Sequence, residues 1–212
     1  MSAEEWSEYL RSLARPVIDR DETVVHTPAV GAFLRWLRGI PAPCITGSPT
    51  RFLSADADVL LWSATTDPTI AVAELIHQLG QDTERNLADQ GALIPQGRHR
   101  TLEVWTESEL SALHALTWLA VNQQQAEWAR LAERVAAWHV QHLQPDNATN
   151  HPWAIHLFIH RSLTTPDVDA ALYAQTLLHN CRVTTGQPDP LSAQILLDAA
   201  NALTRMASDW PQ

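Results

Sequence analysis

Hydrophobic residues recur along most of the chain at intervals of three and four positions, which is the spacing of one face of an α-helix. The pattern is clearest over residues 124–143, where apolar side chains form one stripe and charged side chains occupy the opposite side. Segments 107–121 and 151–163 are apolar on nearly all sides, so we expect these two helices to lie deepest. Over the whole chain, the pattern predicts helices at about 3–14, 28–38, 54–65, 68–90, 107–121, 124–143, 151–163, 166–184 and 190–207.

Several predicted helices begin at a recognisable capping signal. Proline tolerates the first helical position because the N–H that it lacks would have no partner there. A Ser, Thr or Asp just before the helix accepts a hydrogen bond from a free N–H group of the first turn. The chain carries six such signals: Thr27-Pro28, Asp67-Pro68, Thr165-Pro166, Asp189-Pro190, and the capping boxes Ser2 with Glu5 and Thr106 with Glu109. Residues 101–105 alternate weakly between polar and apolar, so we interpret them as loop or as a short edge strand.

The predicted fold class is all-α, with about eight or nine helices packed as antiparallel α-hairpins. Consecutive helices joined by short loops normally pack in this way, and such an α/α array can curve as a toroid does. A weak repeat supports this prediction, since the Gln-Pro-Asp sequences at 144–146 and 187–189 both separate two helices, with a period of about 40 residues. We expect a single helical domain over 1–212, with a proline-interrupted part at 1–52 and a regular hairpin core at 107–207.

Basic residues are few and of one kind: all 14 are arginine, against 24 Asp and Glu, which gives a net charge of −10 and a pI near 5.3. Schiff-base enzymes, phosphate-loop NTPases and protein kinases each use a lysine in a fixed role, so the absence of lysine argues against all three. A surface that tracks phosphates would be strongly basic. We therefore expect neither nucleic acid nor a membrane as a partner.

Other features of the chain bear on its location. The two cysteines, Cys44 and Cys181, do not have the spacing of a metal knuckle, and the first residues lack the apolar stretch of a secretory signal. No apolar run approaches the roughly 18 residues that a membrane-spanning helix needs. These observations favour a cytoplasmic protein.

Histidine is concentrated in one part of the chain, because five of the ten histidines lie between positions 139 and 160. The segment between the two predicted helices there adds carboxylate and amide groups. We interpret this part of the chain, with one neighbouring helix end, as a candidate ligand pocket. Its candidate residues are His139, His142, Asp146, Asn147, Asn150, His151, His156, His160, His179 and Asn180.

A divalent metal, such as zinc, is the alternative occupant of this segment. Neutral imidazoles and a carboxylate are good zinc ligands, and the set of four would be His139, His142, Asp146 and His156. The spacing matches no zinc motif, however. A histidine on an apolar stripe is more often a core residue with a hydrogen-bond partner. We therefore expect no metal and no other cofactor, and structural roles for most of these histidines.

The sequence shows no complete catalytic constellation, since it has neither a GxSxG nucleophile elbow nor a local Cys–His dyad. We therefore interpret the chain as a binding module for a protein or a small ligand. The alternative is a metal- or His-dependent enzyme that uses the segment His139–His160. Nine tryptophans, most of them at helical core spacing, also leave a homo-oligomer open. Asp198 lies inside an apolar helix, so we expect it to be buried and paired, with Arg182 or Arg205 as candidates.

Overall fold

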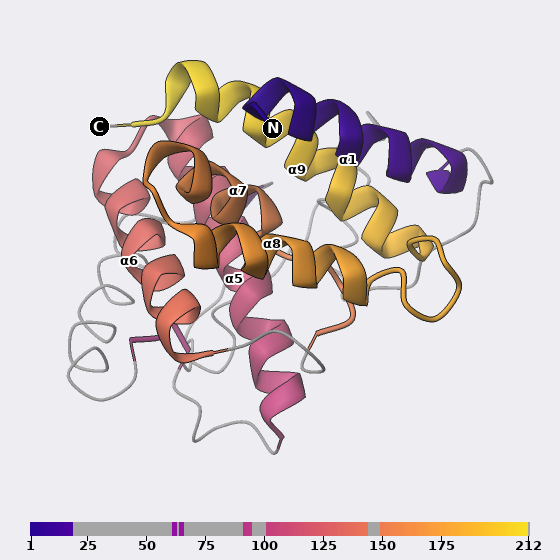
Figure 1. The fold of residues 1–212 in the computed structure, drawn as a ribbon. Coiled ribbons are helices and arrows are strands. Elements are labelled where there is room, and N and C mark those ends of the chain that lie inside the picture. The colour runs from indigo at the N-terminus through magenta and orange to yellow at the C-terminus, as the bar shows by residue number, and fades with distance from the viewer. Residues whose placement is uncertain (19–60, 63, 66–90, 95–100, 144–148, 212) are drawn as a thin grey trace.

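The computed structural model describes residues 1–18, 61–62, 64–65, 91–94, 101–143 and 149–211, and within these ranges it contains six helices and no strand (Figure 1). The helices are α1 (Ala3–Ile18), α5 (Leu102–Gln123), α6 (Ala126–His142), α7 (Ile155–Thr164), α8 (Val168–Asn180) and α9 (Pro190–Asp209). The all-α prediction is confirmed. The predicted helices 28–38 and 68–90 lie outside the described residues, and 54–65 is described only at 61–62 and 64–65, which are helical.

The helices pack partly in chain order and partly across it. Helices α5 and α6 lie together, as do α7 and α8, but α1 lies along α9 (Figure 1). In this last contact the Ser7 hydroxyl donates to the carbonyl of Ala200 at 2.6 Å, and Arg11 donates to the Asn201 side chain at 3.3 Å. The described ranges contain six helices, fewer than the eight or nine predicted, and they show no repeated two-helix unit.

Two of the predicted capping signals are confirmed, and those at 27–28 and 67–68 lie outside the described residues. At the start of α1, the N–H of Ser2 donates to Glu5 Oε2 at 2.7 Å, and the N–H of Glu5 donates to Ser2 Oγ at 3.2 Å. This reciprocal pair is a capping box. At the start of α9, Asp189 Oδ1 accepts from the N–H groups of Leu191 at 2.8 Å and Ser192 at 3.1 Å, and proline takes the first helical position.

The start of α5 contradicts two predictions. Thr101 is the N-cap of this helix and accepts from the N–H of Val104 at 3.4 Å, so residues 102–105 form the first turn and not a strand. Thr106 therefore lies inside the helix, where its hydroxyl donates to the carbonyl of Leu102 at 2.9 Å. The predicted capping box of Thr106 with Glu109 is wrong, because Glu109 is buried and bonds to a different segment of the chain.

The starts of α7 and α8 also differ from the sequence pattern. Helix α8 is capped by Asp167, which accepts from the N–H of Ala170 at 3.0 Å, and not by Thr165. Thr165 instead ends α7. Helix α7 begins at Ile155 rather than near 151, because Ala154 takes a left-handed conformation with φ 55° and breaks the helical path there.

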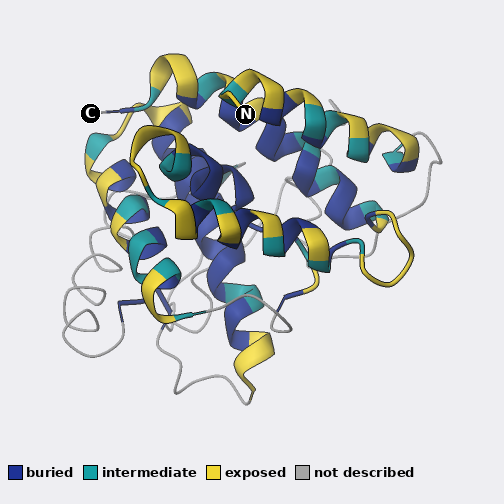
Figure 2. Ribbon diagram, in the orientation of Figure 1, coloured by how far each residue is buried: buried dark blue, intermediate teal, exposed yellow. Residues whose placement is uncertain are grey.

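Helices α5 and α7 form the centre of the described fold (Figure 2). Every residue of α5 from Glu109 to Val121 is buried, as is every residue of α7 from Ile155 to His160. Helices α1, α6 and α8 each present a mixed face to solvent. The prediction that 107–121 and 151–163 lie deepest is confirmed for residues 109–121 and 155–160, and it follows from their lack of a polar side.

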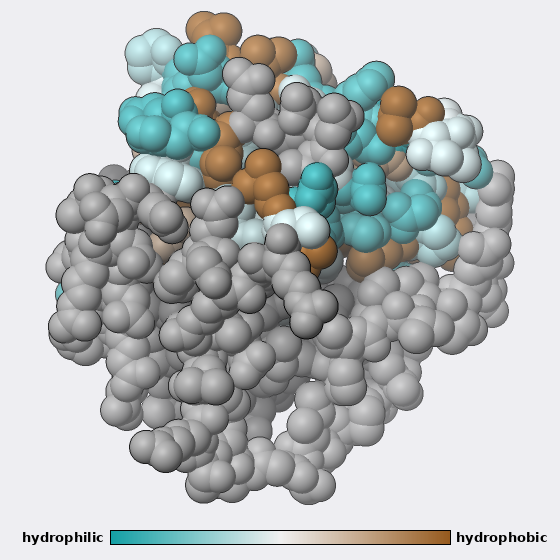
Figure 3. Space-filling view, turned by 90° about the horizontal axis from the view of Figure 1, so that it is seen from below, coloured by the Kyte–Doolittle hydropathy of each residue, from teal (hydrophilic) through white to brown (hydrophobic). Residues whose placement is uncertain are grey.

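The described surface mixes polar and apolar residues. Seen from below, its hydrophilic and hydrophobic parts are interspersed (Figure 3). The most exposed large apolar side chains of the described residues include Val168, Leu172 and Val183. No helix in the described ranges combines the length and apolarity that crossing a bilayer requires. The single domain predicted over 1–212 includes many residues outside these ranges, so it stays a prediction.

Candidate functional site

A carboxylate lies at the centre of the core. Glu109, fully buried on α5, accepts hydrogen bonds from the backbone N–H groups of Leu93 and Ile94, both at 2.7 Å. Segment 91–94 reaches this place because Gly91 passes close to α6, where an added Cβ would lie 2.0 Å from the ring of Trp138. Gly91 also has φ +64°, which favours glycine. The Glu109 carboxylate therefore holds a segment without regular structure against α5.

His139 on α6 completes this polar cluster. Its Nε2 lies 3.4 Å from Glu109 Oε1, and its Nδ1 lies 3.3 Å from the Tyr173 hydroxyl on α8. Because a carboxylate only accepts, Nε2 carries the proton and Nδ1 accepts from the hydroxyl. Burial, together with the charge of Glu109, raises the pKa of Tyr173, so the hydroxyl keeps its proton. Both ring nitrogens of His139 are thus occupied within the core.

A second buried polar pair joins α5 to α9. His114 Nε2 lies 2.9 Å from Asp198 Oδ2, and both side chains are 1% exposed. The backbone N–H of Ala154 donates to His114 Nδ1 at 3.1 Å, so Nδ1 accepts and Nε2 carries the proton. The prediction that Asp198 is buried and paired is confirmed, but its partner is His114 and neither of the two suggested arginines.

His156 on α7 differs from these two histidines. It is fully buried, and neither of its ring nitrogens has a hydrogen-bond partner among the described residues. Its ring meets that of His114 edge-on, with centroids 4.4 Å apart. Burial lowers the pKa of His156 well below its usual value, and the neighbouring His114, Arg205 and His160 lower it further. His156 is therefore a neutral side chain at pH 7.

A third cluster lies nearer the surface. His151 Nδ1 lies 2.5 Å from Glu107 Oε1, which also accepts from Trp153 Nε1 at 2.7 Å. Asp189 Oδ2 lies 3.9 Å from His151 Nε2. Burial lowers the pKa of His151, but the hydrogen bond to Glu107 and the charges of Glu107 and Asp189 outweigh it, so the pKa is raised overall. The cluster ties the segment before α7 to α5 and to the start of α9.

Because the folded pKa of His151 is raised, we expect its pairing with Glu107 to stabilise the protein most in acid. The contribution is fully present below about pH 6.5, the unfolded value, and is lost as the pH rises through the folded pKa. His151→Ala should therefore reduce the free energy of unfolding more at about pH 5.5 than at about pH 8.5. For a pair as exposed as this one, a difference of at most roughly 1 kcal/mol is expected. Urea denaturation at both pH values measures it, and equal losses would contradict the assignment.

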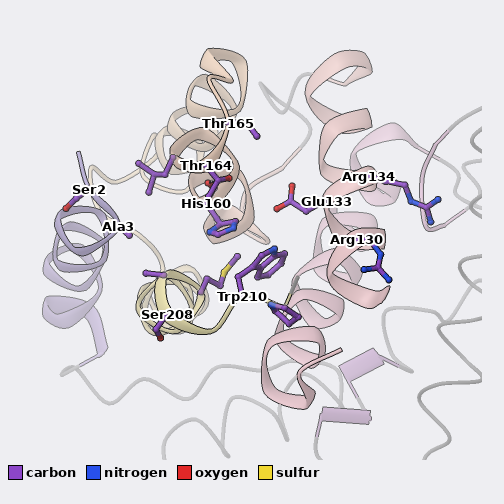
Figure 4. A pocket seen from close by; sticks show the side chains of 14 residues that line it. Ser2, Ala3, Arg130, Glu133, Arg134, His160, Thr164, Thr165, Ser208 and Trp210 are labelled. Atoms are coloured by element: carbon purple, nitrogen blue, oxygen red, sulfur yellow. Dashed lines mark hydrogen bonds between the residues drawn. The ribbon is translucent and has the colours of Figure 1, made fainter. Parts of the chain in front are cut away.

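An open cleft of about 1010 Å³ lies between the start of α1, the side of α6, the end of α7 and the end of α9 (Figure 4). The hydroxyl-bearing residues Ser2, Thr164, Thr165 and Ser208 are among those that line it, together with the apolar Leu163 and Met206. Four helices that are separate in the sequence thus supply one concave surface.

His160 on α7 forms part of the wall of this cleft. It is only 8% exposed, its ring centroid lies 4.8 Å from a ring of Trp210, and neither ring nitrogen bonds to another described residue. Burial lowers the pKa of His160 to about 4, so the ring is neutral at pH 7. A neutral imidazole in the wall offers one hydrogen-bond donor and one acceptor to whatever fills the cleft.

Glu133 on α6 faces His160 across the cleft. Figure 4 shows Glu133, His160 and Trp210 gathered near its middle, whereas Arg130 and Arg134 point away from them. Glu133 Oε2 lies 3.5 Å from Arg161 Nη1, and Oε1 has no partner among the described residues. Burial raises the pKa of Glu133, and the charge and hydrogen bond of Arg161 partly offset this rise.

The structure does not bring the predicted candidate residues together. His139 and His151 bond to different carboxylates, His156 and His160 contact the rings of His114 and Trp210, and His142 stacks on Trp138 of its own helix. The remaining described candidates lie outward: Asn150 and His179 are exposed, and Asn180 is half-buried.

The suggested metal ligands are not assembled in the part of the chain that the structure describes. Asp146, like the pocket candidate Asn147, lies outside the described residues, so the structure does not test a metal site formed by Asp146 with His139, His142 and His156. Among the described residues, no group of three His, Cys, Asp or Glu side chains is placed to hold a metal ion.

Several groups that the structure brings together were not predicted as candidates. They are Glu107, Glu109, His114, Glu133 and Trp210. Three of them lie on α5, a helix that is apolar on nearly all sides. A titratable residue in such a helix has no solvated side to occupy, and this is the sequence signal that could have found them.

Comparison of the chain with protein-family models, with curated proteins and with solved structures gives no match.

Proposed function

We propose that this protein is a binding module whose ligand occupies the cleft between α1, α6, α7 and α9. One observation carries the proposal: His160 is nine-tenths buried, and its unpartnered ring nitrogens belong to the wall of an open cleft. A buried polar group without a hydrogen bond costs about 1–3 kcal/mol, which a bound ligand recovers when it supplies the missing partner. The cleft volume of about 1010 Å³ is that of a site for a small ligand.

Four of the other described histidines support binding over catalysis. A general base needs a ring nitrogen that can reach and accept a substrate proton. His114 and His139 have both ring nitrogens engaged, and His156 is fully buried. His151 lies between two carboxylates that hold it in place. The alternative of a His-dependent enzyme therefore has less support than ligand binding at the cleft.

We expect a fragment screen by thermal shift to yield compounds that raise the melting temperature through this cleft. Ligand at about 100 times its dissociation constant stabilises the folded state by about 2.7 kcal/mol. Ser208→Trp places an indole at the cleft wall and should abolish the shift. Gln175→Trp, on the exposed side of α8, is the matched control and should keep it. A screen without hits, or hits that bind Ser208→Trp equally well, would contradict the proposal.

A further inference from the structure

We infer that the ligand of this cleft is a neutral compound rich in hydroxyl groups, namely a sugar or a sugar-like polyol. The inference rests on the proposed binding function and names the class of ligand. It follows from three properties of the cleft: the balance of charge at its centre, the direction of its hydrogen-bonding groups, and the aromatic ring beside His160.

The charges at the centre favour a neutral ligand. Glu133 is a carboxylate at this point, so an anion placed between it and His160 would be repelled. The Arg161 guanidinium, 3.5 Å from Glu133 Oε2, offsets part of the attraction that this carboxylate exerts on a cation. Arg161 is itself held by Asp167, to which its Nε donates at 2.6 Å. Arg161 is therefore shared by two carboxylates, which disfavours an anion, while Arg130 and Arg134 in the lining reduce the gain for a cation.

The hydrogen-bonding groups of the wall mostly accept. Thr164 Oγ1 donates to the carbonyl of His160 at 3.0 Å, and Thr165 Oγ1 donates to the carbonyl of Arg161 at 2.8 Å. Ser208 Oγ likewise donates to the backbone, at the carbonyl of Arg205. The hydroxyl protons are thus used within the helices, and the oxygen lone pairs remain for the ligand. Such a wall selects a ligand with many O–H donors.

Two groups at the centre sharpen this preference. Glu133 Oε1 has no described partner and can only accept, so it suits a ligand hydroxyl. The neutral ring of His160 offers one donor and one acceptor, and a hydroxyl group of the ligand can likewise donate and accept. A compound with neighbouring hydroxyl groups can donate to the carboxylate and exchange a hydrogen bond with the imidazole at the same time.

The indole of Trp210 supplies the apolar surface that a sugar also needs. Its ring lies tilted at 43° to that of His160, with centroids 4.8 Å apart, beside the apolar side chains of Leu163 and Met206. A sugar ring has a face of C–H groups with hydroxyl groups around its edge. This face can pack on the aromatic surface while the edge reaches Glu133 and the wall hydroxyls.

The test is saturation-transfer difference NMR on the full chain with defined probes. The neutral probes are glucose, galactose, mannose and maltose, and the comparison probes are benzoate, putrescine and N-acetylglycinamide. We expect saturation transfer to at least one sugar and much weaker transfer to the other three compounds. Glu133→Gln keeps the size of the side chain but removes the charged acceptor, and it should weaken sugar binding about tenfold, or about 1.4 kcal/mol. Glu127→Gln, exposed on the same helix, should bind as the wild type does.

The outcomes separate the ligand class from the binding function. If fragments bind at the cleft but no sugar does, or if benzoate, putrescine or the amide binds best, the ligand class is wrong and the binding module stands. If neither fragments nor sugars bind, both proposals fail. Sugar binding that Glu133→Gln leaves unchanged, in a variant with the wild-type melting temperature, overturns the assignment to this cleft.

Discussion

Replacing Glu109 by alanine is expected to destabilise the protein more than any other single substitution considered, by about 3–5 kcal/mol. The side chain is fully buried and accepts from two backbone N–H groups at 2.7 Å and from His139 at 3.4 Å. The variant leaves these donors inside the core without partners, and each unsatisfied group carries its own cost. Urea denaturation followed by circular dichroism measures the loss.

Two further variants test this explanation. Glu109→Gln keeps the volume of the side chain, but its amide nitrogen would face a backbone N–H that needs an acceptor. We expect this variant to lose about 2–3 kcal/mol of the free energy of unfolding. Because it leaves no cavity, this loss reports the charge and the hydrogen bonds of the carboxylate. Glu103→Gln, exposed on the first turn of the same helix, should stay within about 1 kcal/mol of the wild type. A Glu109→Gln variant as stable as Glu103→Gln would show that the carboxylate does not hold segment 91–94.

The second large effect concerns stability in acid. Burial lowers the folded pKa of His156 and His160, whereas both histidines titrate near 6.5 in the unfolded chain. Below about pH 6.5 the unfolded state therefore binds more protons than the folded state. Above about pH 6.5 these two side chains do not reduce the free energy of unfolding, and the free energy of unfolding falls as the pH drops towards their folded pKa. Each of these histidines lowers the free energy of unfolding by up to about 1.4 kcal/mol for every pH unit in that range.

We expect His156→Leu to remove much of this acid sensitivity. Leucine is apolar and similar in size, so it leaves no ring nitrogen buried without a partner. The variant should be as stable as the wild type at about pH 7.5 and clearly more stable at about pH 5. His179→Leu, which removes an exposed histidine from α8, is the control and should follow the wild type at both pH values. If the wild type and His156→Leu lost the same stability between about pH 7.5 and about pH 5, the role given to His156 would be contradicted.

Local signals in the sequence predicted much of the described helical structure. The cap of α9 at Asp189 and the capping box of α1 depend on residues three positions apart or fewer, so they can be recognised without knowing the fold. The deep positions of α5 and α7 could also be predicted, because a helix without a polar side must be surrounded by other elements. The same local reasoning failed for Thr106 and Glu109, whose spacing imitates a capping box. A distant segment takes the Glu109 carboxylate instead.

The candidate site could be predicted only in small part. Clustering of histidines between 139 and 160 reflects their positions along α6, α7 and the segment before α7, whereas the groups they contact come from elsewhere: Glu109 for His139, Glu107 for His151 and Trp210 for His160. Side-chain contacts between distant elements leave no periodic signal in a single sequence. The cleft is harder still to predict, because four helices contribute to it and each supplies only a few ordinary polar residues.

The pairing of α1 with α9 has a consequence for how the protein is made. The Ser7 hydroxyl bonds to the carbonyl of Ala200, 193 positions further along the chain. At ribosomal rates of about 5–20 residues per second, roughly 10–40 s pass between the synthesis of these two residues. During that time the nascent α1 segment carries its apolar side, including Trp6 and Leu10, without the surface that finally covers it. We expect this segment to be where molecular chaperones engage the growing chain.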